Sequence, residues 1–463
     1  MRYISTRGGI APISFKDAVM MGLATDGGLL LPEVLPQISA QTLESWRRLK
    51  YQDLAYEVIS LFSGDIPTAD LRRLLANSYA TFSHPDITPV AKHGDVYILE
   101  LFHGPTLAFK DVALQFLGNL FEYFLQADNS GMNIIGATSG DTGSAAIYGV
   151  RGKERIKIFI LHPHKRVSPI QELQMTTVLD DNVFNLAIKG SFDDGQAIVK
   201  EIFNNLAFKE KHHLGAVNSI NWARILAQIV YYIYSYFRVC DREGEGPVDF
   251  AVPTGNFGDI FAGFLAKQLL TAKRIRRLVL ATNENDILSR FVNQGNYATG
   301  NVSQTCSPSM DIQLASNFER YLYYLNNSDG ERTRREMESF ARSGTLKFEA
   351  AVRERVKDDF AAQRVTEAEI AATIKSFYRQ NNYVLDPHTA VGVTAGIAHK
   401  GDIPMICLAT AHPGKFGDVV GRAIGPQALP QALASLAGME TRCEVVAAES
   451  AVIMDIIARH DKP

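Results

Sequence analysis

The sequence contains few cysteines, and they are widely spaced. Its four cysteines are Cys240, Cys306, Cys407 and Cys443. This spacing provides neither a disulfide framework nor a Cys-x-x-Cys metal site. We therefore expect reduced, mostly buried thiols, which are typical of cytosolic proteins, and we expect no metal site.

The sequence also lacks a long apolar run and an excess of charge of one sign. No window approaches the roughly 18 apolar residues that cross a bilayer, and the opening residues contain no stretch of signal-peptide length. The 47 basic and 50 acidic side chains give a net charge of -3, so no field gathers nucleic acid or anionic lipid. We expect a cytoplasmic protein that binds neither, and a monomer, with a homodimer as the alternative.

Several familiar fingerprints are missing as well. No Gly-x-Gly-x-x-Gly follows a strand pattern and no P-loop occurs, which disfavours Rossmann dehydrogenases and kinases. The Asp141–Gly143 tripeptide resembles an aspartic-protease half-site, but the sequence contains no second copy to share a proton. The histidine pairs His162/His164 and His212/His213 lack helical spacing and a third ligand, so they do not predict zinc.

What the sequence does have is a repeated α/β pattern. With 463 residues, of which 46% are hydrophobic, the chain can form two or three domains. Short apolar runs are followed by glycines with small polar residues and then by helical patterns, which is typical of parallel sheets. Three stretches combine all three features, at 132–150, 248–270 and 404–424. Further strand candidates are Val96–Phe102, Ile156–Leu161, Val183–Ile188 and Arg277–Asn283.

The pattern changes along the chain and predicts its domains. Before about Ile87 the sequence predicts mainly helices, at Ser14–Leu23, Gln41–Ser63 and Thr68–Ser78. A long aromatic helix at Trp222–Val239 precedes the polar segment Asp241–Pro247, which is a candidate junction. The charged stretch Asn326–Ala371 predicts a solvated helical face. We therefore expect a helical domain at 1–86, a smaller α/β lobe at 87–240 and a larger one at 241–463.

Lys110 is the first candidate for chemistry. It follows a strand pattern and a Gly-Pro turn and begins a strongly apolar helical segment. Burial disfavours the ammonium form of a lysine, so the neutral amine can bond covalently to a carbonyl cofactor. The alternative is an ordinary surface ion pair with Asp111.

Two glycine-containing turns are candidate anion sites. The first contains Gly255, Asn256, Phe257, Gly258 and Asp259 between a strand and a helix pattern. Glycines let backbone N–H groups approach a phosphate, and the helix N-terminus adds partial positive charge. Because the turn lacks the lysine of a nucleotide site, it suits a single phosphomonoester. The alternative is a tight turn without a ligand.

The second turn contains Ser139, Gly140, Asp141 and Thr142, whose hydroxyls and backbone donors can hold a carboxylate. Its alternative is a helix N-cap. Thr410 ends a third strand pattern, and ligands of open α/β sheets lie outside the carboxyl ends of strands. A reactive lysine, a phosphate turn, a carboxylate turn and a hydroxyl together indicate a pyridoxal phosphate enzyme.

Motifs in the same order resemble the threonine synthase family, which belongs with tryptophan synthase β and the serine and threonine dehydratases (fold type II). An N-terminal segment similar to the family's contains YISTRGG and FKDAVMMGLATDGGLLLPE. The further motifs are HGPTLAFKDVALQFLGN, GATSGDTGSAA, NSINWARILAQ, PTGNFGDI, SPSMDIQLASNFER, DPHTAVGV and TAHPGKF. The resemblance runs from Tyr3 to about Val420. After about Gln427 we find no motif.

The resemblance implies two open, mostly parallel, three-layer α/β lobes and an N-terminal helical unit. It implies a carbon–oxygen lyase that converts O-phospho-L-homoserine and water to L-threonine and phosphate. Lys110 is then the Schiff-base lysine and proton shuttle, and Thr410 faces the pyridine nitrogen. The NSINWARI motif supplies Asn218, Ser219 and Arg224 as candidates for the substrate phosphate, with a helix-surface ion pair as the alternative for Arg224.

Three possibilities stay open. Asp386 and His388 match a family motif, and we favour a packing role in the pocket wall for them. The chain can be another member of the same superfamily, a dehydratase or a sulfur-handling β-replacement enzyme, although the N-terminal unit and NSINWARI argue against this. It can also be a non-catalytic amino-acid-binding protein, because fold does not dictate activity.

Overall fold

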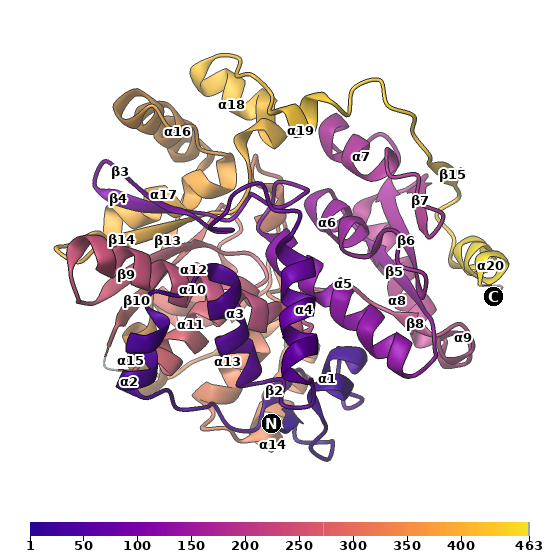
Figure 1. Ribbon diagram of the computed structural model, residues 1–463, viewed down its shortest axis with the longest axis horizontal. Coiled ribbons are helices and arrows are strands. Elements are labelled where there is room, and N and C mark those ends of the chain that lie inside the picture. Colours follow the sequence, from indigo (N-terminus) through magenta and orange to yellow (C-terminus); the bar gives the residue numbers. More distant parts are fainter. Residues whose placement is uncertain (272, 462–463) are drawn as a thin grey trace. The chain divides into compact units, whose positions relative to one another are not determined.

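The computed structural model describes residues 1–271 and 273–461, which divide into two compact units. Unit 1 contains Met1–Phe109 and Ser219–Gln427, and unit 2 contains Lys110–Asn218 and the chain from Ala428 onward. Both units are built of mostly parallel strands and helices, so the expected fold class is confirmed (Figure 1). Within the described residues, no helix combines the length and apolarity needed to span a membrane.

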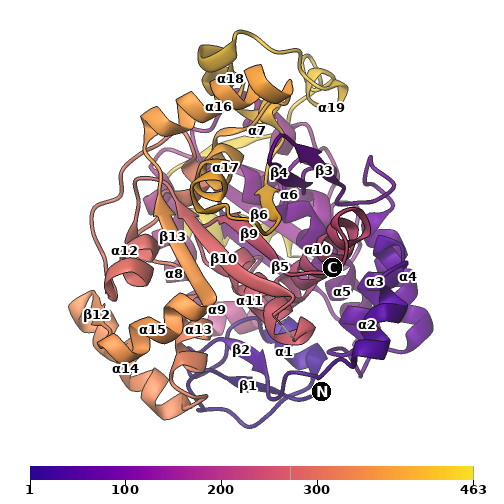
Figure 2. The same ribbon diagram turned by 90° about the vertical axis from the view of Figure 1, so that its left-hand side faces the viewer.

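Unit 1 is built on a six-stranded sheet, with the order β13-β10-β9-β14-β4-β3 (Figure 2). All neighbouring pairs are parallel except β3 and β4. The strands are short and almost fully buried near the middle of the sheet, as parallel strands covered on both faces should be. Their bounds are β3 Val90–His93, β4 Val96–Glu100, β9 Val248–Pro253, β10 Ile275–Thr282, β13 Phe360–Arg364 and β14 Met405–Ala409.

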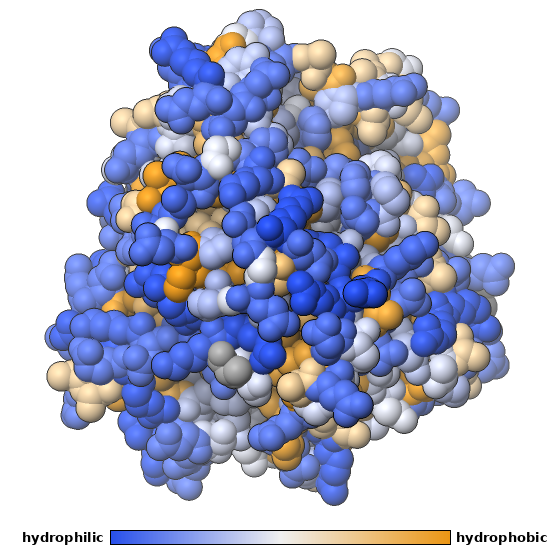
Figure 3. All heavy atoms as spheres, turned by 60° about the vertical axis from the view of Figure 1, so that its left-hand side comes forward, coloured by the Kyte–Doolittle hydropathy of each residue, from blue (hydrophilic) through white to orange (hydrophobic). Residues whose placement is uncertain are grey.

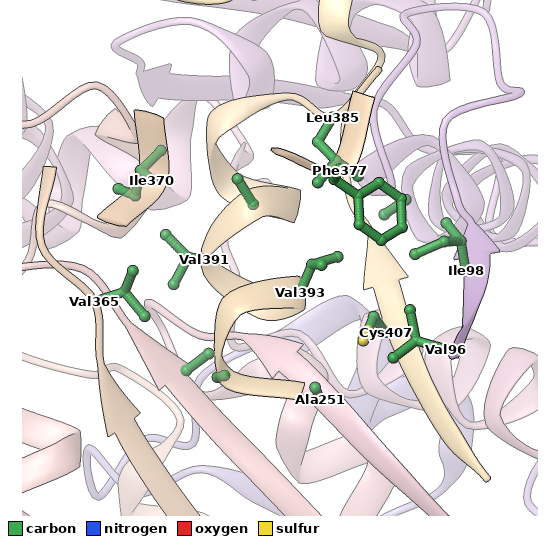
Figure 4. Packing of buried hydrophobic residues seen from close by; sticks show 14 of the residues in the cluster. Val96, Ile98, Ala251, Val365, Ile370, Phe377, Leu385, Val391, Val393 and Cys407 are labelled. Carbon is green, nitrogen blue, oxygen red and sulfur yellow. The ribbon is translucent and has the colours of Figure 1, made fainter. Parts of the chain in front are cut away.

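Helices cover both faces of this sheet. Side chains alternate along a strand, so Leu278 and Val279 of β10 point to opposite faces. Val279 belongs to the cluster packed around α17 (Pro387–His399), and Figure 4 shows Val391 and Val393 of that helix within it. Leu278 instead lies beside Gly263 of α11 (Gly258–Leu270). Unit 1 is therefore a three-layer α/β structure.

The N-terminal segment packs onto α10 (Trp222–Glu243) and belongs to unit 1. The ring of Tyr51 makes edge contacts with Tyr79 and with Tyr234 of α10. The indole of Trp222 donates a 3.1 Å hydrogen bond to the hydroxyl of Tyr3. The segment contains β1 Tyr3–Ser5, α1 Phe15–Met21, β2 Leu30–Pro32, α2 Ala40–Trp46, α3 Tyr51–Ser60 and α4 Thr68–Tyr79.

Unit 2 contains a fully parallel five-stranded sheet, with the order β15-β7-β6-β5-β8. The tail after Gln427 supplies its edge strand β15, which pairs with β7, and α20, which packs on α8 (yellow in Figure 1). Its strands are β5 Met132–Ala137, β6 Ile156–Pro163, β7 Val183–Ile188, β8 Leu214–Gly215 and β15 Glu444–Val446. Its helices are α5 Lys110–Ala127, α6 Asp141–Val150, α7 Pro169–Thr176, α8 Phe192–Asn204, α9 Leu206–Lys211, α19 Gln431–Ala434 and α20 Ser450–His460.

The compact units divide the chain at different points from the expected domain boundaries. Residues 1–86 fall within unit 1 and pack on α10, and the expected domain boundaries stay a prediction. The segment Asp241–Pro247 connects α10 with β9 inside unit 1, and the last part of 241–463 returns to unit 2. The charged stretch Asn326–Ala371 contains the sheet strand β13 as well as helices. All four cysteines are unpaired, and Cys240 and Cys407 are buried while Cys443 is exposed.

The other elements of unit 1 surround its sheet. They are α12 Ile287–Gln294, β11 Asn296–Ala298, η1 Pro308–Met310, α13 Phe318–Leu325, α14 Gly330–Ser343, β12 Thr345–Lys347, α15 Ala350–Asp359, α16 Glu367–Asn381, η2 Pro413–Phe416 and α18 Gly417–Ile424.

Candidate active site

Lys110 is the first residue of α5, and it is buried. In unit 2 its Nζ lies 3.7 Å from Oδ2 of Asp141, the first residue of α6. Oδ1 of Asp141 accepts a 2.7 Å hydrogen bond from Nε2 of Gln171. Asp111 is buried as well, so neither residue lies at the surface, as the alternative considered for Lys110 would require.

The turn before α6 is fixed by its own side chains. Oγ1 of Thr138 accepts hydrogen bonds from the amides of Gly140 at 3.0 Å and Gly143 at 2.9 Å. Gly140 has φ of +155°, and a Cβ there would lie 2.6 Å from Oε1 of Gln171, so glycine is required. Ser139 is exposed and Thr142 half-buried. Two candidate hydroxyls are thus held on a rigid turn. Thr138 and Gln171, which hold the turn, were not among the residues predicted from the sequence.

The turn before α11 has a different construction. Phe257 is buried and adopts the left-handed conformation, with φ of +63°. A Cβ on Gly255 would lie 2.9 Å from the carbonyl oxygen of Ser309, so the backbone approaches too closely for any other residue. The N-cap residue of α11, Phe257, offers no side-chain hydrogen bond to the first amides of this helix. Its first amides, with the partial positive charge of the helix, form a suitable phosphate site.

Asp259 in the first turn of α11 points into the protein. Its Oδ1 accepts hydrogen bonds from the hydroxyls of Tyr231 at 2.6 Å and Tyr232 at 2.8 Å. Burial raises the pKa of Asp259 to about 6, although the two hydroxyls favour its charged form. The carboxylate of Asp259 is therefore bonded to these tyrosines, and only the backbone of Asp259 faces the turn as a candidate hydrogen-bond donor to an anion.

Thr410 follows β14, and its backbone is held on both sides. Its amide donates a 3.1 Å hydrogen bond to Oγ1 of Thr389, and its carbonyl accepts one of 2.8 Å from the amide of Phe109. The Thr389 hydroxyl in turn donates to Asp386, the N-cap of α17. These bonds fix the position from which the Thr410 side chain projects.

Asp386 and His388 do more than pack. Nδ1 of His388 lies 3.0 Å from Oδ1 of Asp386, and its Nε2 accepts a 3.2 Å hydrogen bond from the amide of Ser309. Because Nε2 accepts, Nδ1 carries the proton. Ser309 is the residue against which Gly255 packs. Asp386 is therefore connected both to Thr410 and to the turn before α11.

Arg224 lies in the first turn of α10 and is 5% exposed, so it forms no surface ion pair. Across the described residues, its Nε and Nη1 have no hydrogen-bond partner. Burial lowers the pKa of Arg224 to about 10, which leaves it charged at neutral pH. A buried cation with unused donors is costly, and an anion bound there would relieve that cost.

The other two candidates of the NSINWARI motif border the same helix. The hydroxyl of Ser219 lies 2.7 Å from that of Ser316, which also donates to Oδ1 of Asn256 at 3.3 Å. Ser219 and the turn before α11 are therefore linked within unit 1. Oδ1 of Asn218, which ends the first segment of unit 2, has no partner in the part of the chain that the structure describes.

The residues of each unit can be matched to parts of pyridoxal phosphate. Unit 2 offers the buried amine of Lys110 for the aldehyde. Unit 1 offers a helix N-terminus for the phosphate and Thr410, at the carboxyl end of a parallel strand, for the pyridine nitrogen. Each unit, taken by itself, therefore contains groups of the kind that this cofactor binds.

Comparison with known proteins gives matches along nearly the whole chain. A family model described as "Threonine synthase N terminus" matches residues 2–79, one described as "Pyridoxal-phosphate dependent enzyme" matches 84–405, and "Threonine synthase, C-terminal" matches 389–457. The last match covers most of the tail in which we found no motif.

Among curated proteins, the threonine synthase of Schizosaccharomyces pombe is 48% identical, over 91% of this chain and 89% of its own. That of Pseudomonas aeruginosa is 44% identical, over 99% of this chain and 98% of its own. Among solved structures, the PLP-bound threonine synthase of Brucella melitensis matches with a TM-score of 0.96 and 43% identity, and both chains are fully covered.

Proposed function

The chain belongs to the threonine synthase family of pyridoxal-phosphate-dependent enzymes, and from this membership we propose which of its residues carry the reaction. The reaction converts O-phospho-L-homoserine and water to L-threonine and phosphate, the last step of threonine biosynthesis. Its cofactor is pyridoxal 5'-phosphate.

Lys110 would hold the cofactor at its aldehyde carbon, the backbone from Gly255 to Asp259 would bind the cofactor phosphate, and the Thr410 hydroxyl would be the partner of the pyridine nitrogen. Bound pyridoxal phosphate withdraws electrons from the amino-acid substrate and so makes its Cα and Cβ protons removable. A hydroxyl cannot protonate the ring nitrogen as a carboxylic acid would. Thr410 therefore restrains this withdrawal, which suits chemistry at Cβ and Cγ.

Lys110 moves the protons. With the cofactor and substrate bound, Nζ of Lys110 would carry protons one at a time: from Cα and then from Cβ to the departing phosphate and to Cγ, and, as the hydroxyl of water adds at Cβ, from that water to Cα. Asp141 supports this role, because its carboxylate lies 3.7 Å from Nζ and stabilises the ammonium form that Lys110 takes after each abstraction.

Two groups of residues bind the substrate. The turn with Ser139, Gly140, Asp141 and Thr142 receives the substrate carboxylate through hydroxyl and backbone donors. Asn218, Ser219 and Arg224 receive its phosphate. The observation that carries this proposal is Arg224, whose buried guanidinium has two nitrogens without a partner in residues 1–271 and 273–461. A phosphate is the ligand that best satisfies a guanidinium.

Replacing Arg224 by alanine tests the substrate-phosphate site. Arg224→Ala should raise KM for O-phospho-L-homoserine on the order of a hundredfold, because charge-assisted hydrogen bonds are lost, and should leave cofactor loading unchanged. Arg224→Lys keeps the charge but loses the planar guanidinium, so its KM should lie between those of the wild type and Arg224→Ala. If Arg224→Ala weakened cofactor binding as much as it raised KM, the arginine would instead have a structural role in unit 1.

The activity itself is tested by phosphate release from O-phospho-L-homoserine, with threonine identified in the same reaction. One phosphate per threonine is the expected result. Phosphate released with a keto acid in place of threonine would contradict the assignment of the water-addition step to this site.

We also propose a monomer in the cytoplasm that does not bind nucleic acid. The net charge of -3 supports this, and so does the face in Figure 3, where hydrophobic residues lie in small groups among hydrophilic ones. Light scattering of the purified protein should give 51.1 kDa, and a mass of twice that value would establish the dimer instead.

A further inference from the structure

The motif SPSMDIQLASNFER has no role in the reaction as proposed above. Its residues nevertheless contact both anion segments of unit 1, which are the segment with Ser219 and the turn with Asn256. It contains η1, with Ser309, and leads into α13. Asn317, the N-cap of α13, is fully buried. Its neighbour Ser316 bridges Ser219 and Asn256 by hydroxyl contacts, as described above.

Asn317 binds the backbones of both anion segments with one amide group. Its Nδ2 donates a 3.1 Å hydrogen bond to the carbonyl of Ser219 and another of 3.1 Å to the carbonyl of Asn256. Its own backbone amide donates to the same Asn256 carbonyl at 3.0 Å. Ser219 belongs to the substrate-phosphate group and Asn256 to the cofactor-phosphate turn, so one side chain joins the two.

Arg320, one turn further along α13, fixes the orientation of this amide. Its Nη1 donates to Oδ1 of Asn317, and its Nη2 donates to the carbonyls of Ile220 at 2.6 Å and Leu30 at 3.0 Å. A guanidinium only donates, so Oδ1 of Asn317 must face it and Nδ2 must face the two carbonyls. Arg320 is fully buried, and its geometry therefore leaves Asn317 no second orientation.

We propose that Asn317 is a positioning residue that couples the cofactor-phosphate turn to the substrate-phosphate segment, so that the affinities for the two phosphates depend on the same hydrogen bonds. The proposal rests on the assignment of Ser219 and Arg224 to the substrate phosphate. It requires no contact between Asn317 and either phosphate.

The test is Asn317→Ala in the full-length protein. Cofactor affinity is measured by removing and retitrating pyridoxal phosphate. The substrate side is measured by KM for O-phospho-L-homoserine and by inhibition with inorganic phosphate. We expect all three to weaken on the order of tenfold, since two hydrogen bonds to fixed carbonyls are lost, while kcat changes much less. The ³¹P resonance of the bound cofactor should also shift.

The matched control is Asn326→Ala at the other end of α13. Asn326 is buried too and donates to Thr333 and Glu336, away from both anion segments. It should lower the melting temperature comparably and leave the three affinities and the ³¹P resonance unchanged. If Asn317→Ala does not fold, Asn317→Ser, whose hydroxyl can replace one of the two bonds, is measured in the same way.

A change in stability alone, or in the affinity for only one phosphate, would overturn the coupling. Failure of the substrate-phosphate assignment has a different signature. In that case Arg224→Ala keeps a normal KM, while Asn317→Ala still weakens cofactor binding.

Discussion

Two strand-to-helix turns with similar sequences, one before α6 and one before α11, satisfy their helix N-termini in different ways. Before α6, Thr138 accepts hydrogen bonds from two amides of the turn, and Asp141 extends toward Lys110. Before α11, the N-cap residue Phe257 makes no side-chain cap hydrogen bond, and Asp259 turns inward to two tyrosines. In the first turn a protein side chain bonds two of the amides and a carboxylate faces the amine of Lys110, whereas the second turn offers an anion its backbone amides without a carboxylate beside them.

The difference shows that a glycine-containing turn does not define its ligand by glycine alone. The direction of the acidic residue in the first helical turn decides whether the site presents a carboxylate or only backbone N–H groups. The α6 turn therefore suits a role beside a catalytic amine, and the α11 turn suits a phosphate dianion.

The largest expected effect comes from removing the amine of Lys110, which lies beside Asp141 of the α6 turn. Lys110→Ala should lower threonine formation at least about a thousandfold and abolish the visible absorption of the lysine-bound cofactor, because both proton transfer and covalent attachment are lost. The melting temperature should change little. Lys200→Ala, at an exposed lysine of the same unit, is the control and should keep full activity. Near-normal threonine formation by Lys110→Ala would refute the assignment.

A pair of glycine variants sharpens the comparison. Gly255→Ala forces a Cβ to within 2.9 Å of the Ser309 carbonyl, so the α11 turn must shift, and we expect cofactor affinity to fall roughly tenfold or more. Gly140→Ala is strained by its φ and by Gln171, and should raise KM for the substrate instead. The dissociation constant of the cofactor and KM for the substrate are measured for both variants.

The control for this pair is Gly421→Ala, where a Cβ meets no atom within 4 Å. It should change neither constant. Loss of cofactor affinity in Gly140→Ala to the same extent as in Gly255→Ala would remove the distinction between the two turns.

The features that could be predicted from the sequence are those encoded locally. The three strand–glycine–helix stretches form β5 with α6, β9 with α11 and β14 with η2 and α18, because apolar runs and glycines determine each connection from nearby residues. The family followed from ordered motifs and is confirmed by the comparisons. Roles of individual site residues stay predictions until the variants above are measured.

The features that could not be predicted depend on distant partners. The strand β13 lies in a charged stretch, and only its pairing with β10 makes it a strand. The strand β15 pairs with β7, 258 residues earlier in the chain, since Glu444 lies opposite Leu186. The surroundings of Arg224 were also hidden, because α10 is buried on nearly every face, including its polar side chains, and its sequence does not show which of these are enclosed. Asn317 acts through backbone carbonyls, which leave no signal in the sequence.

The smallest expected effect concerns the inward-facing Asp259, and it is a pH dependence of stability. The folded pKa of about 6 lies above the unfolded value near 3.8, so the folded state holds the proton longer. Stability contributed by the protonated carboxyl is therefore present below about pH 4 and is lost as pH rises to about 6. Two pKa units correspond to about 3 kcal/mol.

Asp259→Asn should remove this dependence, because asparagine resembles the protonated acid and its oxygen can still accept from Tyr231 and Tyr232. Chemical unfolding at several pH values should show equal stability of variant and wild type near pH 4, and a more stable variant above pH 6. If the free energy of unfolding changed equally with pH in both proteins between pH 4 and 6, the cost of burying the Asp259 carboxylate would already be offset by its surroundings. Asp259 would then present its charge at the α11 turn much as Asp141 does beside Lys110, and the contrast between the two turns would fail.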